Sequence, residues 1–96
     1  MSRIYIYKKP VHMGLSFNGL TDIVQENFDR AISSGTKFLF FNRKQNYIKI
    51  LFRENDGFVL LAKRLDSGSF PLAGRESITL KELSELVTDA RFYTSK

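Results

Sequence analysis

The sequence contains no cysteine and only one histidine. Without cysteine, the chain can form neither a disulfide framework nor a zinc site with thiolate ligands. No apolar run approaches the roughly 18 residues that span a membrane. The opening stretch "MSRIYIYKKPVHMG" also lacks the apolar core of a signal peptide. From these absences we expect a cytoplasmic protein.

Groups suited to catalysis are equally scarce. His12 is the only histidine, so a Ser-His-Asp triad would have to be built around it, and "PVHMG" is not a nucleophile elbow. We interpret His12 as a loop residue that makes local hydrogen bonds. The remaining candidate ligands are carboxylates on the polar sides of two expected helices, so we expect no enzyme, no metal site and no cofactor. These carboxylates are Asp22, Glu26, Asp29, Glu82, Glu85 and Asp89.

Positive charge is concentrated in the middle of the chain. Residues 37–75 hold eight basic and three acidic residues, and this excess of five equals the net charge of the whole chain. The other residues carry seven charges of each sign. A local excess of this kind is typical of proteins that bind polyanions, although it can also serve solubility alone. With 96 residues, 43% of them hydrophobic, we expect residues 1–96 to form a single domain.

Alternating β-forming residues predict four strands. A fifth, short edge strand is expected near "DSGSFPL", because proline is tolerated at a sheet edge. The connections "NRKQN" and "ENDG" are short enough to make antiparallel hairpins. The expected strands cover residues 3–7, 36–41, 47–53 and 58–65.

Two helices flank these hairpins in the sequence. Asn18 is expected to cap the first helix, which runs to about Ile32. Thr79 and Glu82 form a capping box for the second helix, and the tail after Arg91 is expected to fray. The predicted fold class is α+β: an antiparallel β-meander of about four to five strands, with one helix from the N-terminal half and one C-terminal helix packed on one face.

The register of the hairpins decides which side chains share a face. We expect Phe41 to face Tyr47 and Arg53 to face Phe58, because shifting the second hairpin by one residue would place two lysines opposite each other. In this register one sheet face is apolar and is covered by the helices. The other face then collects basic and aromatic side chains.

This basic and aromatic face is the strongest candidate site. Spaced cations can contact successive phosphates, and aromatic rings can stack on unpaired bases. The same face could instead be a protein interface, or a partly covered layer on which Lys and Arg stems lie with their charges in water. The candidate nucleic-acid contacts are Arg43, Lys44, Lys49, Arg53, Arg64 and, on the opposite face near the sheet edge, Lys63; the candidate stacking residues or partner anchors are Phe41, Tyr47 and Phe58.

Three stretches resemble a known family. They are "FNGLTDIVQ" (17–25), "SGTKFLFFNRKQNYIKIL" (34–51) and "NDGFVLLAKRLDSGSF" (55–70). In this order they are similar to the small accessory protein encoded by the second open reading frame (Orf2) of insertion sequence 66 (IS66) transposons. Typical members read Asp-Met-Arg-Lys before Ser-Phe-Asp-Gly-Leu. Here the first four of these positions hold His12, Met13, Gly14 and Leu15.

The resemblance implies a role in DNA transposition beside a separate transposase. It implies no catalytic activity for this chain, and it makes DNA, the transposase or both the expected partners. The positions that match basic residues of the family pattern are Arg43, Lys44, Lys49, Lys63 and Arg64.

Overall fold

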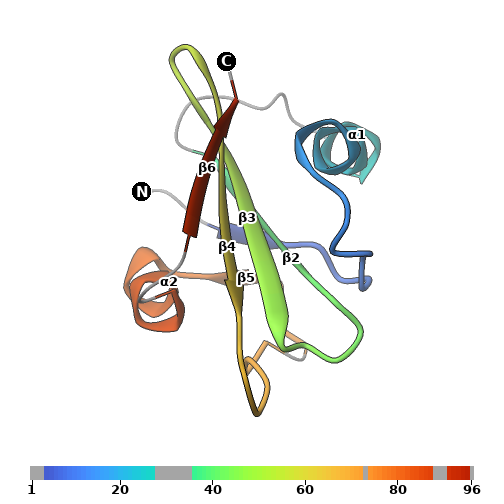
Figure 1. The fold of residues 1–96 in the computed structure, drawn as a ribbon, viewed down its shortest axis with the longest axis vertical. Helices are drawn as coiled ribbons and strands as arrows, with labels where there is room; N and C mark the ends of the chain where they lie inside the picture. The colour runs from blue at the N-terminus through green and yellow to red at the C-terminus, as the bar shows by residue number, and fades with distance from the viewer. Residues whose placement is uncertain (1–3, 28–35, 73, 88–90, 96) are drawn as a thin grey trace.

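An open sheet of six strands separates two helices in the structure (Figure 1). The computed structural model describes residues 4–27, 36–72, 74–87 and 91–95 of the chain. The elements are β1 (Ile4–Ile6), α1 (Phe17–Asn27), β2 (Lys37–Phe41), β3 (Tyr47–Glu54), β4 (Gly57–Arg64), β5 (Ser77–Ile78), α2 (Leu80–Leu86) and β6 (Arg91–Ser95). Across the sheet the strands follow the order β5-β1-β2-β3-β4-β6.

The sheet is mostly antiparallel, and the expected α+β class is confirmed. Only β1 and β2 pair in parallel among the described strands, with α1 between them in the sequence. The expectation of an edge strand near Pro71 was wrong, because the described residues around Pro71 form no strand. The edge strand beside β1 is β5. The expectation that the tail frays after Arg91 was wrong, because β6 pairs with β4 and forms the other edge.

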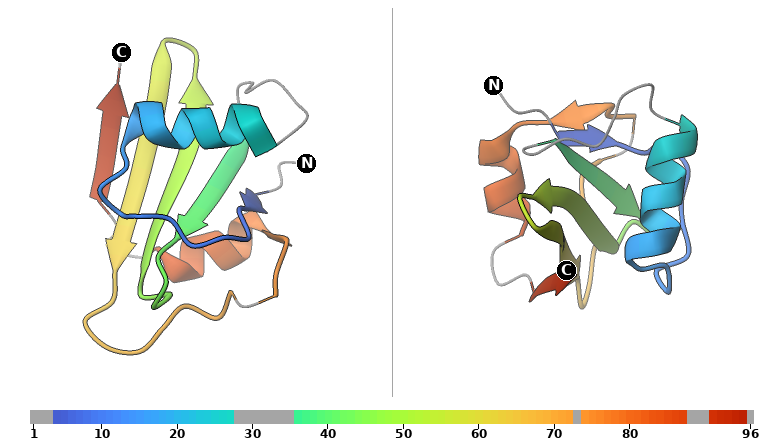
Figure 2. Two further views of the ribbon diagram at one scale, coloured as in Figure 1. Left: turned by 90° about the vertical axis from the view of Figure 1, so that its right-hand side faces the viewer. Right: turned by 90° about the horizontal axis from the view of Figure 1, so that it is seen from above.

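The two helices lie on opposite faces of the sheet, so the expectation that they share one face was wrong. Figures 1 and 2 show α1 on one side of the strands and α2 on the other. The physical reason lies in β2, whose residues "FLFF" are buried on both faces. Both faces of the central strands are therefore apolar, and each needs a cover.

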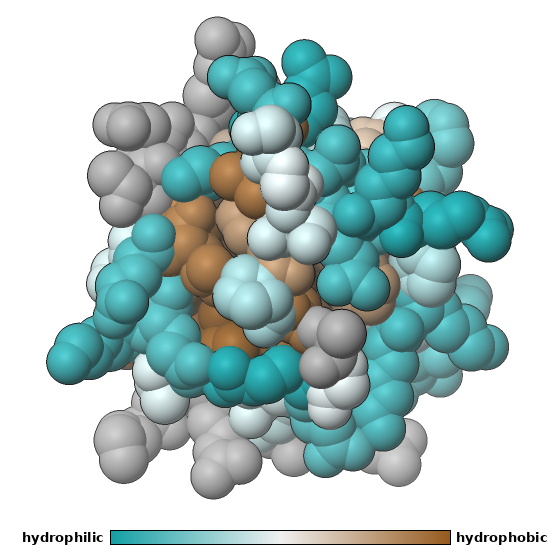
Figure 3. All heavy atoms as spheres, turned by 90° about the horizontal axis from the view of Figure 1, so that it is seen from below, coloured by the Kyte–Doolittle hydropathy of each residue, from teal (hydrophilic) through white to brown (hydrophobic). Residues whose placement is uncertain are grey.

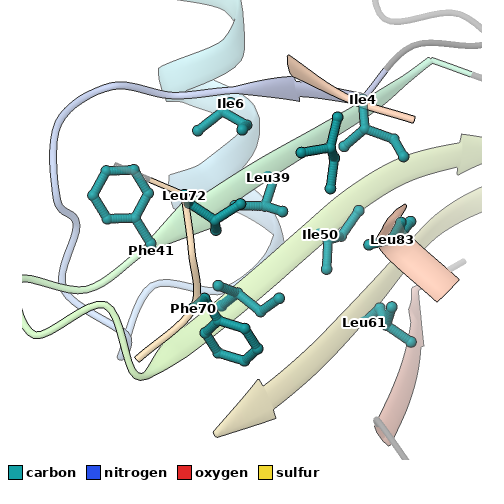
Figure 4. Close-up of a cluster of buried hydrophobic side chains, with 11 residues drawn as sticks. Ile4, Ile6, Leu39, Phe41, Ile50, Leu61, Phe70, Leu72 and Leu83 are labelled. Carbon is teal, nitrogen blue, oxygen red and sulfur yellow. The ribbon is translucent and has the colours of Figure 1, made fainter. Parts of the chain in front are cut away.

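Each helix closes one hydrophobic cluster. The cluster beneath α2 includes side chains from β1, β3 and β4, and the segment that follows β4 adds Phe70 and Leu72 (Figure 4). The cluster beneath α1 is built by Leu20, Val24, Phe38, Phe40, Leu51 and Leu60.

The second hairpin has its predicted register, whereas the first hairpin is shifted by one residue from the register predicted for it. Arg53 pairs with Phe58, as expected, but Phe41 pairs with Ile48 rather than with Tyr47. A shift of one residue moves every side chain of a strand to the other face. Phe41 therefore points into the cluster beneath α2.

The helix boundaries partly follow the expected capping signals. α1 begins at Phe17, before the expected cap at Asn18, and the N–H of Leu20 donates to the carbonyl of Ser16 over 3.0 Å. The predicted end of this helix near Ile32 lies outside the described residues. The predicted capping box of α2 is confirmed by hydrogen bonds in both directions between Thr79 and Glu82. Neither described helix is long and apolar enough to cross a membrane.

Candidate functional site

The turn between β2 and β3 presents two basic side chains. The N–H of Gln45 donates to the carbonyl of Asn42 over 3.0 Å, which closes a four-residue β-turn. Arg43 and Lys44 are the central residues of this turn, and both are exposed. Gln45 has a φ of 57°, in the left-handed region, and leads the chain back into β3. We call residues 42–47 the hairpin tip.

Hydrogen bonds hold the hairpin tip in one shape. Oδ1 of Asn42 accepts from the N–H groups of Asn46 and Tyr47 at 3.0 and 3.1 Å. Nδ2 of Asn42 donates to Oδ1 of Asn46 at 2.7 Å. The N–H groups of Leu65 and Phe70 each donate to a carbonyl of the tip at 2.7 Å. These hydrogen bonds connect the tip to the segment that follows β4 and fix the backbone that carries Arg43 and Lys44.

Lys49 ties a second segment to the same end of the sheet. Its Nζ donates to the carbonyls of Met13 and Leu15 at 2.7 and 2.8 Å. Its side chain is 8% exposed, and it is the one buried charged residue among those described. Burial lowers the pKa of Lys49 below its ordinary value. The expectation that Lys49 lies on an open face was wrong, because residues 12–16 pass over it.

An open hollow of about 580 Å³ lies between the hairpin tip and the loop before α1. We call it the hairpin-end hollow. Seen from below, the end of the molecule that carries the tip shows hydrophilic side chains around a smaller apolar area (Figure 3). Three basic residues and no Asp or Glu contribute to the lining. The lining residues are Pro10, Val11, His12, Met13, Asn42, Arg43, Lys44, Asn46, Tyr47 and Arg64.

The three cations of the hairpin-end hollow have no ion-pair partner within the described ranges. The salt bridges found there join Lys8 to Glu76 and Arg75 to Glu82. A guanidinium that is not already paired with a carboxylate can donate to a phosphate with both of its N–H edges. The arrangement is therefore suited to an anion.

The other predicted basic contacts do not join this group. Arg53 lies six residues beyond Tyr47 on β3, which corresponds to about 20 Å along an extended strand. Its guanidinium lies 5.1 Å from the ring centroid of Phe58, its partner across the strands. Lys63 pairs with Ile48, on the face that α2 covers, as the sequence predicted. Of the six predicted cations, the structure brings Arg43, Lys44 and Arg64 together.

The three predicted aromatic anchors are also separated. Phe41 is 8% exposed and belongs to the cluster beneath α2, so its expected place on an open face was wrong. Phe58 is half-buried against the cluster beneath α1, at the far end of the sheet. Tyr47 is half-buried and lines the hairpin-end hollow.

Two lining residues did not stand out from the sequence as members of a site. Asn42 shapes the hairpin tip, and the spacing of Asn42 and Asn46 around the basic pair was the available signal. His12 is exposed, and its Nδ1 accepts from the N–H of Gly14 at 2.9 Å, which confirms the predicted local hydrogen bond. In the described part of the chain, no three His, Asp or Glu side chains gather as metal ligands.

The fold and the hollow define a small α+β protein in which three cations without an ion-pair partner lie together at one end of the described sheet. The chain belongs to the IS66 Orf2-like family, whose family model, described as IS66 Orf2 like protein, matches residues 2–92. Membership associates the chain with the accessory proteins of transposition. Comparison with curated proteins and with solved structures gave no significant match.

Proposed function

We propose that this protein is a non-catalytic accessory factor of transposition that binds DNA through the hairpin-end hollow. The observation that carries the proposal is the set of unpaired cations, Arg43, Lys44 and Arg64, in a lining without a carboxylate. Such a set favours phosphate, the most abundant anion on a DNA surface. Cleavage and joining of strands are left to a separate transposase.

Family membership supports the same location. The loop that replaces the family's charged signature, residues 12–15, lies at the hollow through His12 and Met13. The "FFNRK" stretch contributes Asn42, Arg43 and Lys44 to the hairpin tip. The "KRLDSGSF" stretch supplies Arg64 together with the two N–H groups that hold the tip. Segments that carry the family resemblance thus meet at one place in the fold, although they are far apart in the sequence.

Three phosphate contacts give a definite salt dependence. With three contacts, the slope of log K against log salt is about −2.7 for duplex DNA. Between 50 and 200 mM salt, this slope corresponds to a loss of roughly 40-fold in affinity. A much steeper slope would require cations outside the hollow.

Two double variants with equal change in charge test the proposal. Arg43→Gln with Arg64→Gln removes two cations from the hollow, and Arg53→Gln with Lys63→Gln removes two of the predicted contacts that lie elsewhere. In a fluorescence-anisotropy titration with a labelled duplex, we expect the first pair to lose roughly tenfold in affinity per lost contact at 0.1 M salt and to flatten the salt slope. The second pair should bind nearly as the wild type does. Equal losses in both pairs would sink the assignment to the hollow.

The transposase is the second candidate partner at the same hollow. Tyr and Arg are enriched at the cores of protein interfaces, and Tyr47 and Arg64 lie side by side on β3 and β4. If the transposase docks there, it should compete with DNA for the protein in a pull-down. Binding of both partners at once would place the transposase on another surface.

A further inference from the structure

The inference concerns Tyr47 and rests on the proposed function, because it names the form of DNA that the hollow takes. Tyr47 and Lys49 are two apart on β3, so both side chains stand on the α1 side of the sheet. Nζ of Lys49 lies 5.9 Å from the centroid of the Tyr47 ring, over its face. Tyr47 lines the hollow and Lys49 does not. The ring therefore has the Lys49 ammonium at one face, and the Tyr47 side chain also forms part of the wall of the hollow.

Three basic residues line the same hollow as this ring. Arg64 pairs directly with Tyr47 across β3 and β4, and side chains in such positions have Cβ atoms about 4.5–5.5 Å apart. Arg43 and Lys44 approach from the turn and line the same hollow. An aromatic surface and three phosphate-binding groups are thus presented together, which is the combination used to bind single strands.

A base in a duplex cannot use this ring. The two faces of a paired base are covered by the neighbouring base pairs, so an aromatic side chain can stack on a base only when that base is unstacked. A hollow of about 580 Å³ has the size of sites that hold small organic ligands, so one nucleotide fits within it. We propose that the hairpin-end hollow binds an unpaired DNA nucleotide, with the base on Tyr47 and the phosphate between Arg64 and the hairpin tip.

A comparison of single and double strands tests this inference. The probes are a labelled 12-nucleotide oligo(dT) and a labelled 12-base-pair duplex, each titrated with the full chain at two salt concentrations. We expect Tyr47→Leu to lower the affinity for the single strand by roughly 5- to 100-fold and to leave the affinity for the duplex within about twofold. Tyr47→Phe should retain the single-strand affinity, because the ring is kept. Equal losses for both probes, or no loss for either, would overturn the inference.

Intrinsic fluorescence gives a second readout that does not depend on the stability of Tyr47→Leu. The chain has four tyrosines and no tryptophan, so tyrosine emission can be followed directly. A base that stacks on Tyr47 should quench part of this emission in the wild type. The quenching should disappear in Tyr47→Phe although the strand still binds. Quenching that persists in Tyr47→Phe would place the base elsewhere.

The outcomes separate this inference from the proposed function. If the Arg43→Gln and Arg64→Gln pair weakens duplex binding while Tyr47→Leu changes nothing, the hollow binds phosphate only, and the inference fails alone. If neither probe binds at low salt, both proposals fail. A mononucleotide, dTMP, serves as competitor, and displacement of the oligonucleotide at an equal concentration would assign the hollow to a free nucleotide instead of a strand.

Discussion

At the scale of single residues, Lys49 differs most from what its sequence context suggests. Its position on a strand between apolar neighbours is typical of a cation on a solvated face. In the structure its ammonium is covered and donates to two carbonyls of the loop before α1. Lys49 therefore acts on the hollow indirectly, by holding the loop that carries His12 and Met13.

Replacing Lys49 should loosen this loop. In Lys49→Met the carbonyls of Met13 and Leu15 lose their donor, so we expect the free energy of unfolding to fall by about 1–3 kcal/mol. Urea denaturation followed by circular dichroism measures this change. The control is Lys44→Met, an exposed position where the change should stay within about 0.5 kcal/mol. Equal stability of the two variants would mean that the Lys49 ammonium does not hold the loop.

A sequence cannot predict this role, because the contacts of Lys49 join residues 34 and 36 positions apart. The same limit explains Phe41. It belongs to the run "FLFF", in which every residue is apolar, so alternation gives no sign of which side faces which cluster. Arg43 and Lys44 could be placed from the sequence because the segments that connect strands run over the protein surface.

At the scale of elements, the β2–β3 hairpin depends on the side chain of Asn42. Asn42→Ala removes three hydrogen bonds of the hairpin tip without changing the charge. We expect a loss of about 1–3 kcal/mol in the free energy of unfolding, together with weaker DNA binding, because the cations lose their fixed backbone. The control is Asn55→Ala in the turn between β3 and β4, which is exposed and should change neither quantity. Unchanged DNA affinity in Asn42→Ala would show that the shape of the tip does not matter for binding.

The capping box at the start of α2 makes a prediction about pH. The guanidinium of Arg75, at 2.7 Å, and the backbone N–H of Thr79 lower the pKa of Glu82 to about 2 from an ordinary value of 4.5. A lowered carboxyl pKa stabilises the folded state above pH 4.5, and this contribution is lost as the pH falls through about 2.

Thermal unfolding of the wild type and of Glu82→Gln between pH 6 and pH 2 checks this expectation. The difference in melting temperature between the two proteins should be largest near neutral pH and should shrink as the pH falls below about 4.5. A constant difference over the whole range would contradict the assigned role of Glu82.

The elements themselves were largely predictable. The bounds of β2, β3 and β4 agree with the predicted strands within one residue, because turn residues separate β-forming runs. The register of the first hairpin was not predictable to the residue. Its five connecting residues allow more than one turn, and the structure uses a β-turn in which Asn42 and Tyr47 lie opposite each other. Relative to the predicted register, the shift of one residue exchanges the faces on which the β2 side chains lie. Both sheet faces are then apolar, which is why the helices do not share one face as predicted.

At the scale of the whole molecule, the charge found in the middle of the sequence is divided in space. Part of it is buried at Lys49, and part lies at the far end of the sheet at Arg53. Lys63 lies on the face that α2 covers, whereas Arg43, Lys44 and Arg64 lie together where the hairpin tip, the loop before α1 and the end of β4 meet. The charged segment can be found in the sequence, but the fold is needed to show which of its cations share a surface.

The loop before α1 also shows how this chain keeps its shape without the charged family signature. The imidazole of His12 accepts from the N–H of Gly14, a bond that an aspartate can make in the same kind of turn. A Cβ at position 14 would lie 2.7 Å from Nδ1 of His12, so the glycine leaves room for the ring. The residues at positions 12 and 14, two of the three that differ from typical members in this stretch, are therefore compatible with each other.

The central claim is that DNA binds at the hairpin-end hollow, and amide chemical shifts of the ¹⁵N-labelled chain test it most directly. A short DNA strand is added in steps, and the shift of each backbone amide is followed. Binding at this hollow predicts that the largest changes occur at residues 11–14, 42–47 and 64, which line the hollow or lie next to lining residues. Largest changes around Arg53 and Phe58, or on α2, would contradict it.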